Sequence, residues 1–377
     1  MSATSVRSSL REAKRVVVKV GSALLTDAKA GLAQPKIADF SAQISELLKA
    51  NYEVVLVSSG AVAAGVNRLG WSERPTHLHE LQAAAAVGQM GLVEAYEAAL
   101  SSHGCRTAMI LLTHDDLSNR ERYLNARATL SQLLQLQVVP VVNENDTVAT
   151  EEIRFGDNDT LSALVTNLIE ADLLIILTDV EGLMDKDPRT HPDAVRVAQA
   201  SSSDAQLDEL PSRQAGELGR GGMVTKLSAA RLAARSGAHT VIANGYSANV
   251  LAQIVDGADI GTLLTSDLTR MTARKRWIAG QLKAKGDLVV DNGAGRALRT
   301  QGVSLLAVGV VAVRGTFDRG DMIRCLLADG TVVAQGLVNY SSGEVEKLVG
   351  VRSEAFAEHI AFVAEPELVH RDNLVIS

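Results

Sequence analysis

Mainly apolar runs, many rich in β-branched residues, alternate with stretches of helical periodicity along the first two thirds of the chain. The runs at 15–20, 54–57, 107–112, 138–142, 172–178, 240–243 and 262–264 predict strands. Between them, Ile37, Phe40, Ile44 and Leu47 follow helical spacing after Pro35, and helices are also predicted after Gly60 and at about 78–101, 119–135 and 161–171. Strands that alternate with helices of this length favour βαβ units. The predicted fold is a three-layer αβα sandwich with a mainly parallel sheet.

The pattern changes after about residue 266. Short Val-rich runs at 288–290, 309–313 and 331–333 are separated by turns that contain Gly and Asp, and no long amphipathic helix is expected before about Glu344. This predicts a second, small domain that resembles a β-barrel. The expected organisation is a disordered leader (1–14), a large domain (15–266), a basic linker (267–283), the small domain (284–363) and a tail (364–377).

Composition narrows the class of protein. The net charge of −7 argues against a general nucleic-acid binder. Cys105 and Cys325 lie far apart and form neither a metal signature nor a disulfide framework, so a cytoplasmic location is expected. No apolar run approaches the roughly 20 residues of a membrane helix, and no membrane partner is expected.

Two polar clusters follow the predicted strand at 138–142. The first contains Asn143, Asn145 and Asp146, and the second contains Asp157, Asn158 and Asp159. Ligands bind at the carboxyl edge of open α/β sheets, so these side chains are expected to converge on one crevice. Either cluster alone could equally be a plain turn, since Asn, Asp and Gly are common there.

Other strand ends carry candidates for anion binding. Lys19 is the only charge in its strand after Arg15 and could meet phosphate oxygens, or simply reach solvent. Ser58, Ser59 and Gly60 lead from a strand into a helix, where backbone N–H groups bind anions, although such residues are also ordinary caps.

Two further segments indicate a nucleotide. Thr178 and Asp179 follow a buried strand and could contact a nucleotide or cap the next turn. The segment 219–226 has three glycines before a helix start, with Lys226 about one turn inside, although its spacing is not that of a Walker A loop. Together these features predict phosphoryl transfer from ATP to a small polar acceptor. A carboxylate acceptor would need no general base, since it is already ionised at pH 7.

Six motifs occur in the order seen in glutamate 5-kinases of the amino-acid kinase superfamily, and the chain resembles that family. They are VVKVGS (17–22), VSSGAVAAG (57–65), VNENDTV (142–148), FGDNDTLSA (155–163), LTDVEGL (177–183) and GGMVTK (221–226). The C-terminal region is similar to the PUA domain appended to many bacterial members. The resemblance implies phosphorylation of the side-chain carboxylate of L-glutamate, the first step of proline synthesis, with ATP and Mg²⁺ as cofactors.

The resemblance also implies roles for individual residues. Lys19 and Lys226 would neutralise the transferring phosphoryl group, and Asp159 would hold the two lysines. No dedicated protein ligands are expected for Mg²⁺, which would arrive with ATP. The implied glutamate-binding residues are Ser59, Asp146 and Asn158, with Asn143 and Asp157 as neighbours. The implied ATP-binding residues are Lys19, Thr178, Asp179, Arg220, Gly221, Gly222, Met223 and Lys226.

One position departs from the family pattern, because Arg220 stands where a threonine is expected between the glycines. A threonine hydroxyl contact is lost there, and the added charge would meet a phosphate or point to solvent. Family members are commonly inhibited by proline and form homo-oligomers, dimers or tetramers, so both properties are expected.

The sequence is compatible with two alternative functions, phosphorylation of a different substrate and RNA binding. Acetylglutamate kinase, aspartokinase and uridylate kinase share the superfamily scaffold, and βα patterning alone does not separate them. PUA domains elsewhere often bind RNA. RNA binding is not expected here, because residues 284–363 hold eight Lys and Arg against nine Asp and Glu.

Overall fold

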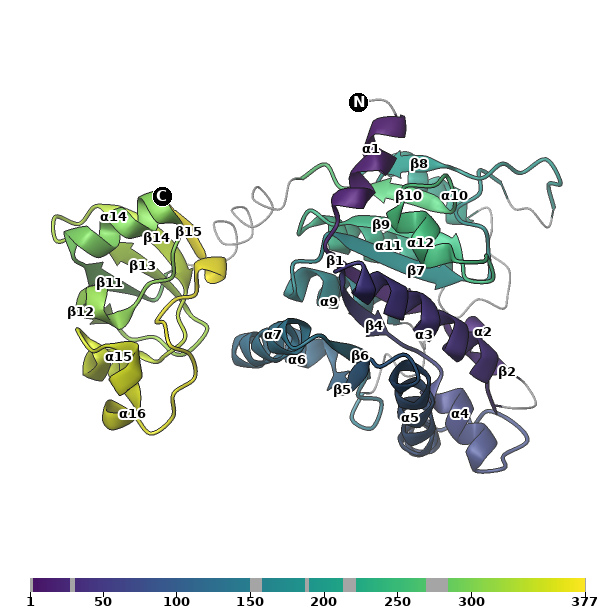
Figure 1. The fold of residues 1–377 in the computed structure, drawn as a ribbon, viewed down its shortest axis with the longest axis horizontal. Helices are drawn as coiled ribbons and strands as arrows, with labels where there is room; N and C mark the ends of the chain where they lie inside the picture. Colours follow the sequence, from purple (N-terminus) through teal and green to yellow (C-terminus); the bar gives the residue numbers. More distant parts are fainter. Residues whose placement is uncertain are drawn as a thin grey trace. The chain divides into compact units, whose positions relative to one another are not determined.

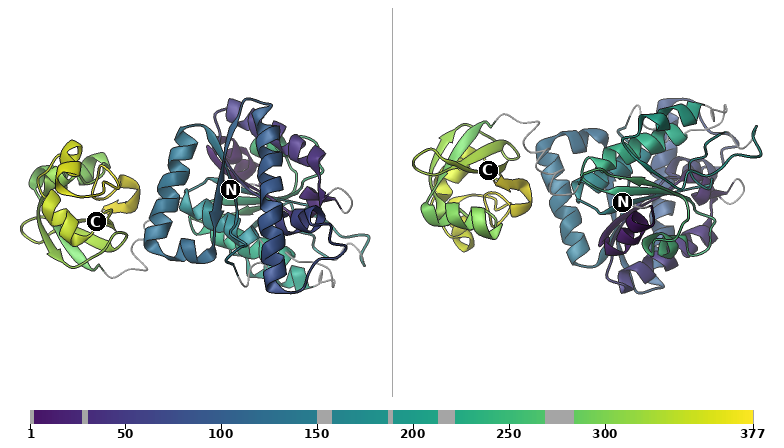
Figure 2. Two further views of the ribbon diagram at one scale, coloured as in Figure 1. Left: turned by 90° about the horizontal axis from the view of Figure 1, so that it is seen from below. Right: turned by 90° about the horizontal axis from the view of Figure 1, so that it is seen from above.

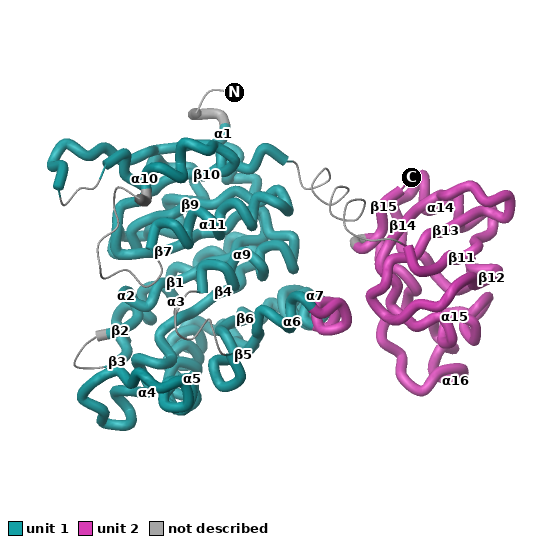
Figure 3. Tube along the Cα trace, turned by 180° about the vertical axis from the view of Figure 1, so that it is seen from behind, with its two compact units in different colours: residues 1–118, 126–270 teal, residues 119–125, 271–377 magenta. Residues whose placement is uncertain are grey.

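The computed structural model describes residues 3–27, 31–149, 158–186, 190–212, 222–268 and 284–376, with backbone alone for residues 3–5, 27, 211, 212 and 372. The chain forms two compact units (Figure 3). Unit 1 consists of residues 1–118 and 126–270, and unit 2 of residues 119–125 and 271–377. Most of the linker predicted at 267–283 lies outside the described residues.

Unit 1 is built on an eight-stranded sheet with the order β5-β6-β4-β1-β7-β9-β10-β8 (Figure 1). The first six strands in this order run parallel to one another. Their bounds are β1 Arg15–Val20, β4 Glu53–Val57, β5 Arg106–Leu112, β6 Val138–Glu144, β7 Leu173–Thr178 and β9 His239–Asn244.

The far edge of this sheet differs from the prediction. β10 (Thr262–Thr265) was expected to extend the parallel sheet, but it pairs antiparallel with β9, and the unpredicted short strand β8 (Gln199–Ser201) pairs parallel with β10. A two-stranded ribbon of β2 (Thr26–Asp27) and β3 (Gly31–Leu32) stands apart from the sheet. Periodicity detects β10 but does not fix its direction, which depends on how the preceding segment crosses the sheet.

Helices cover both faces of the sheet (Figure 2). Helices α3, α5 and α12 supply a large apolar core on one face, while α9 and α11 pack against each other and against β1, β7 and β9. The predicted αβα sandwich is therefore confirmed. The bounds are α2 Ser22–Leu25, α3 Gln34–Lys49, α4 Ala61–Arg68, α5 Leu78–Ser101, α6 His114–Ser118, α7 Arg120–Gln135, α9 Asn158–Leu168, α10 Glu209–Ser212, α11 Met223–Ala234 and α12 Val250–Val255.

The N-terminal segment is helical, which corrects the prediction of a disordered leader. α1 (Ala3–Ser9) continues into a 3₁₀ turn at Leu10–Glu12 before β1 begins. Leu10 is 1% exposed, and Val6 packs against the same core cluster. The spacing of these two residues by four positions was the available sequence signal, since i and i+4 lie on one helix face.

Unit 2 holds a separate five-stranded sheet with the order β12-β11-β13-β14-β15. β11 and β13 are parallel and the other pairs are antiparallel. Helix α14 was not predicted; Asp291 caps it by accepting from the N–H of Ala294, and Gly302 ends it at φ +60°. The bounds are β11 Gly286–Val290, α14 Asn292–Gln301, β12 Val310–Gly315, β13 Met322–Leu326, β14 Val332–Leu337, α15 Ser342–Leu348, α16 Phe356–His359 and β15 Leu374–Ile376.

Candidate active site

Several of the predicted site residues lie at the carboxyl ends of neighbouring parallel strands. Lys19 lies near the end of β1, Asn143 near the end of β6, and Thr178 ends β7, while Ser58 and Ser59 follow β4 directly. In the register, Lys19 pairs with Val57 of β4 and with Ile176 of β7. The strands therefore bring these side chains to one edge of the sheet, as the sequence predicted.

Asp159 connects two lysines that come from distant parts of the chain. Its Oδ1 lies 2.6 Å from Nζ of Lys19, and its Oδ2 lies 3.0 Å from Nζ of Lys226. Thr225 Oγ1 also donates to Oδ2 at 2.9 Å. Asp159 is fully buried, and the two lysines are nearly so.

The charge state of Asp159 follows from these neighbours. Burial opposes ionisation, but the two ammonium groups outweigh it and hold the pKa of Asp159 below its usual range. The carboxylate is therefore ionised at neutral pH. Two ammonium groups against one carboxylate leave a net positive charge, and an anion such as a phosphoryl group fits this charge.

A chain of side-chain amides joins the neighbouring strand ends. Nδ2 of Asn158, in the first turn of α9, donates to Oδ1 of Asn143 at 2.7 Å, to Oγ of Ser59 at 3.2 Å and to the carbonyl oxygen of Ser58. Nδ2 of Asn143 donates in turn to Oε1 of Gln89 at 2.7 Å. The backbone carbonyl of Ser58 can only accept, so it fixes which end of the Asn158 amide faces it.

The position of the start of α4 depends on the close packing of α4 against α5. Gly60 precedes the helix at φ +100°, in the left-handed region that favours glycine. Gly65 in α4 and Gly88 in α5 allow the two helices to cross closely: an added Cβ would lie 1.7 Å from the Ala84 oxygen at Gly65 and 1.8 Å from the Ala61 oxygen at Gly88. The first N–H groups of α4 follow Ser59 directly, so this crossing sets the position of a candidate anion pocket.

Asp146 occupies a turn that follows β6. It is half-buried, and burial raises its pKa to about 6, against the opposing influence of Arg74. The end of the same turn is held by Gln82, whose Nε2 donates to the carbonyl oxygen of Ala149 at 3.1 Å. An ammonium group beside Asp146 would favour its ionised form, because it supplies the opposite charge.

The turn after β7, residues 178–182, is anchored at both ends. Thr178 Oγ1 donates to Oδ1 of Asp179 at 3.1 Å, and the Thr178 carbonyl oxygen accepts from the N–H of Gly245 at 2.8 Å. At the other end Gly182 has φ +140°, and the N–H of Leu183 donates to Oγ1 of Thr262 at 2.9 Å. We call residues 178–182 the β7 turn.

The glycine-rich segment is described only from Gly222 onward. Gly222 precedes α11 in an extended conformation, Met223 is the first helical residue, and Lys226 lies one turn inside. The first turn of α11 carries the positive end of the helix dipole, and Lys226 lies in the same turn. Asp157, Arg220 and Gly221 lie outside the described residues.

The amino acid kinase family model matches residues 14–244, and the PUA domain model matches residues 286–360. Glutamate 5-kinase from Thioalkalivibrio sulfidiphilus is 57% identical over 373 residues, covering 99% of this chain and 100% of the relative. The chain belongs to the glutamate 5-kinase family. The family prediction made from the motifs is confirmed.

Another glutamate 5-kinase, from Pseudomonas syringae pv. tomato, is 56% identical over 371 residues, covering 98% of this chain and all of the relative. Among solved structures, UMP kinase from Bacillus anthracis covers 68% of this chain and 97% of its own at 15% identity, with a TM-score of 0.48. Among the described residues, no helix has the length and apolar character to cross a membrane.

Sequence reasoning missed several residues of this glutamate 5-kinase family site. Gln89, Thr225 and Tyr96 were not singled out, although Gln89 and Thr225 donate to or accept from predicted site residues, and the fully buried Tyr96 lies 3.3 Å from Oγ of Ser58. One signal was available for Gln89, a single polar side chain within the apolar stretch at 83–93. Tyr96 and Thr225 sit in ordinary helical context, which carries no such signal.

Proposed function

We propose that this protein transfers the γ-phosphoryl group of ATP to the side-chain carboxylate of L-glutamate, giving L-glutamyl 5-phosphate and ADP. One glutamate oxygen forms a bond to the γ-phosphorus, and the bond between that phosphorus and the bridging oxygen to the β-phosphate breaks. The acceptor is already ionised, so no proton has to be removed. Catalysis of this kind consists of positioning and charge stabilisation.

The observation that carries the proposal is the ion cluster of Lys19, Asp159 and Lys226. The cluster lies at the sheet edge with both ammonium groups on one buried carboxylate, at 2.6 and 3.0 Å. In this arrangement Asp159 holds the lysines at a fixed separation, and the lysines stabilise charge on the transferring phosphoryl oxygens. We assign catalytic roles to these three residues.

We assign glutamate binding to the residues around the amide chain. Asp146 would receive the substrate ammonium group, and Ser59 with the N–H groups at the start of α4 would receive an anionic group. Asn158 and Asn143, which are hydrogen-bonded to each other, would position the substrate together, and Asp157 is assigned here by resemblance alone. Proline, which carries the same α-carboxylate and ammonium nitrogen, would compete at this site as an inhibitor.

We assign ATP binding to Lys19, the β7 turn with Thr178 and Asp179, and the α11 start. Gly222 and Met223 offer N–H groups to phosphate oxygens, and Lys226 projects from the same helix. Arg220 and Gly221 belong to this group by resemblance. Mg²⁺ would be held by ATP and would offset the charge of the phosphates, while Asp159 remains engaged by the two lysines. We further expect a homo-oligomer in the cytoplasm.

The test is acceptor choice by the purified full-length protein. ADP release would be followed with ATP, Mg²⁺ and either L-glutamate, N-acetyl-L-glutamate, L-aspartate or UMP, with hydroxylamine present to trap an acyl phosphate. We expect hydroxamate from L-glutamate alone and suppression by proline. A Lys226→Met variant serves as the control for contaminating kinases. Preference for another acceptor would contradict the proposal.

A further inference from the structure

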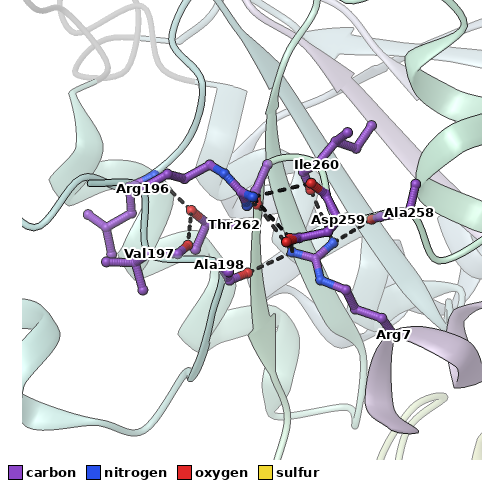
Figure 4. A network of polar contacts seen from close by, with 10 residues as sticks. Arg7, Arg196, Val197, Ala198, Ala258, Asp259, Ile260 and Thr262 are labelled. Carbon is purple, nitrogen blue, oxygen red and sulfur yellow. Dashed lines mark hydrogen bonds and ion pairs between the residues drawn. The ribbon is translucent and has the colours of Figure 1, made fainter. Parts of the chain in front are cut away.

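The side chain of Arg7 is buried against the far edge of the sheet in unit 1 (Figure 4). Its guanidinium group donates to four backbone carbonyl oxygens and lies 3.3 Å from Oδ1 of Asp259. The four acceptors are Ala258 at 2.7 Å, Ile260 at 3.1 Å, Ala198 at 2.6 Å and Gly261 at 3.2 Å. Three of these carbonyls belong to one turn, residues 258–261, which leads into β10.

Arg196 holds the same turn from the other side (Figure 4). It donates to the carbonyl oxygens of Gly261 and Asp259, and its Nη2 lies 3.0 Å from Oδ1 of Asp259. The guanidinium groups of Arg7 and Arg196 therefore both bind this turn, and both contact the carboxylate of Asp259. Hydrogen bonds from charged donors are stronger than neutral ones, so the turn has little freedom to shift.

The next residue, Thr262, connects this turn to the candidate nucleotide site. Its side chain is buried, and its Oγ1 donates to the carbonyl oxygen of Val197 at 2.7 Å while accepting from the N–H of Leu183 at 2.9 Å. Leu183 follows the β7 turn, and a Cβ on Gly182 would lie only 2.6 Å from Thr262 Oγ1. Contact there is tight, so a shift of Thr262 must displace Gly182 or Leu183.

We propose that Arg7 is a positioning residue that sets the affinity for the nucleotide, acting through the 258–261 turn and Thr262 on the β7 turn. The inference rests on the proposed function in one respect, that the β7 turn contacts ATP. The described residues assigned to glutamate binding lie on β6, in the segments that directly follow β4 and β6, and at the start of α9. In the strand order, β1, β7 and β9 separate β4 from β10. Loss of Arg7 should therefore weaken nucleotide binding selectively.

The experiment compares Arg7→Ala with the unaltered protein by calorimetric titration with MgADP and by steady-state kinetics for ATP and glutamate. We expect the Kd for MgADP and the KM for ATP to rise by roughly two- to thirtyfold, the range for residues that act on a site without touching the ligand. The KM for glutamate should stay within about twofold. Arg11→Ala is the matched control, since Arg11 lies in the same segment but makes one exposed hydrogen bond, to the Asp256 carbonyl oxygen. It should leave both affinities unchanged.

A purely structural role would give a different result. An Arg7→Ala protein that melts at a lower temperature but binds MgADP with unaltered affinity overturns the proposal, as does an equal rise in both KM values. If Arg7→Ala does not fold, Arg7→Lys takes its place under the same criteria, because one ammonium group cannot reach four carbonyls. If the unaltered protein phosphorylates no glutamate, the proposed function fails, while the MgADP titration still decides the role of Arg7.

Discussion

Nδ2 of Asn143 donates a hydrogen bond to Oε1 of Gln89, with 2.7 Å between the two atoms. The Gln89 amide is oriented in turn by Met109, whose sulfur accepts from Nε2 at 3.4 Å. The amide chain therefore has an acceptor at each end, the Met109 sulfur and the Ser58 carbonyl. Gln89 of helix α5 thus fixes the orientation of the two asparagines in the proposed glutamate site.

Replacing Gln89 tests this orientation. Gln89→Met keeps the length of the side chain but removes the acceptor, so the KM for glutamate should rise by roughly two- to tenfold, as for loss of one hydrogen bond. Gln89→Glu keeps an acceptor for Asn143 and should restore most of the affinity. The KM for ATP should not change in either variant. Equal defects in the two variants would show that the acceptor at position 89 does not set the affinity for glutamate.

Replacing Asp159 by Asn should destabilise the protein as well as inactivate it. The amide NH₂ would face one of the two ammonium groups, and removing the charge of a buried ion cluster costs about 3–5 kcal/mol. Urea unfolding measures this loss, and ADP release measures the activity. Thr225→Val is the matched control, because it removes a hydroxyl donor to the same carboxylate oxygen, worth about 1.5–3 kcal/mol, and leaves the charges in place. Comparable losses in the two variants would argue against a charge cluster.

Lys226→Met should act on turnover more than on substrate binding. The methionine keeps much of the apolar stem and removes the ammonium group, so kcat should fall by roughly a hundred- to a thousandfold, as for loss of one group that stabilises transition-state charge. The KM for glutamate should stay within about threefold. Steady-state kinetics at saturating ATP measures both, and near-normal turnover would remove Lys226 from the mechanism.

The pKa of Asp146 predicts the pH dependence of glutamate use. Burial raises this pKa to about 6, and only the ionised carboxylate attracts the substrate ammonium group. At pH 5 about one tenth of the enzyme carries that charge, so kcat/KM for glutamate should fall roughly tenfold below its value at pH 7.5. The substrate side chain, with a pKa of about 4.3, stays largely ionised over this range.

The variant Asp146→Asn separates this effect from other titrations. Its kcat/KM for glutamate should be low at every pH and should lose the inflection near pH 6, while the KM for ATP stays unaltered. Measurements between pH 5 and 8 at constant ionic strength give both profiles. An inflection that persists in the variant would assign it to another group.

The sequence alone predicted the features that depend on local pattern. Lys19 stood out as the one charge after Arg15 in an apolar strand, and the cluster at 157–159 followed a strand end, so the two could be brought to one edge by topology alone. The pairing of Lys19 and Lys226 on Asp159 came only from the family resemblance. Local spacing does not determine which of several nearby carboxylates forms an ion pair with a given lysine.

The features that were missed depend on partners far away in the chain. Arg7 is separated by 251 residues from Ala258, whose carbonyl it binds, and nothing near Arg7 indicates that partner. Gln89 is 54 residues from Asn143. Helix α14 was missed for a different reason. Its sequence consists mainly of small, polar and charged residues, and its buried residues are Gly295 and Leu298, so it shows no clear apolar periodicity. Packing, rather than intrinsic propensity, stabilises a helix of this kind.

Gly65 and Gly88 are exceptions to the rule that alanine stabilises a helix relative to glycine. Alanine in place of a helical glycine usually stabilises a helix by about 0.5–1 kcal/mol. At these two positions the added methyl group would meet a backbone oxygen of the other helix, at 1.7 and 1.8 Å, and would force α4 and α5 apart. A redesign that raises helix propensity along the chain would thus move the start of α4 and weaken glutamate binding, with no residue in the pocket altered.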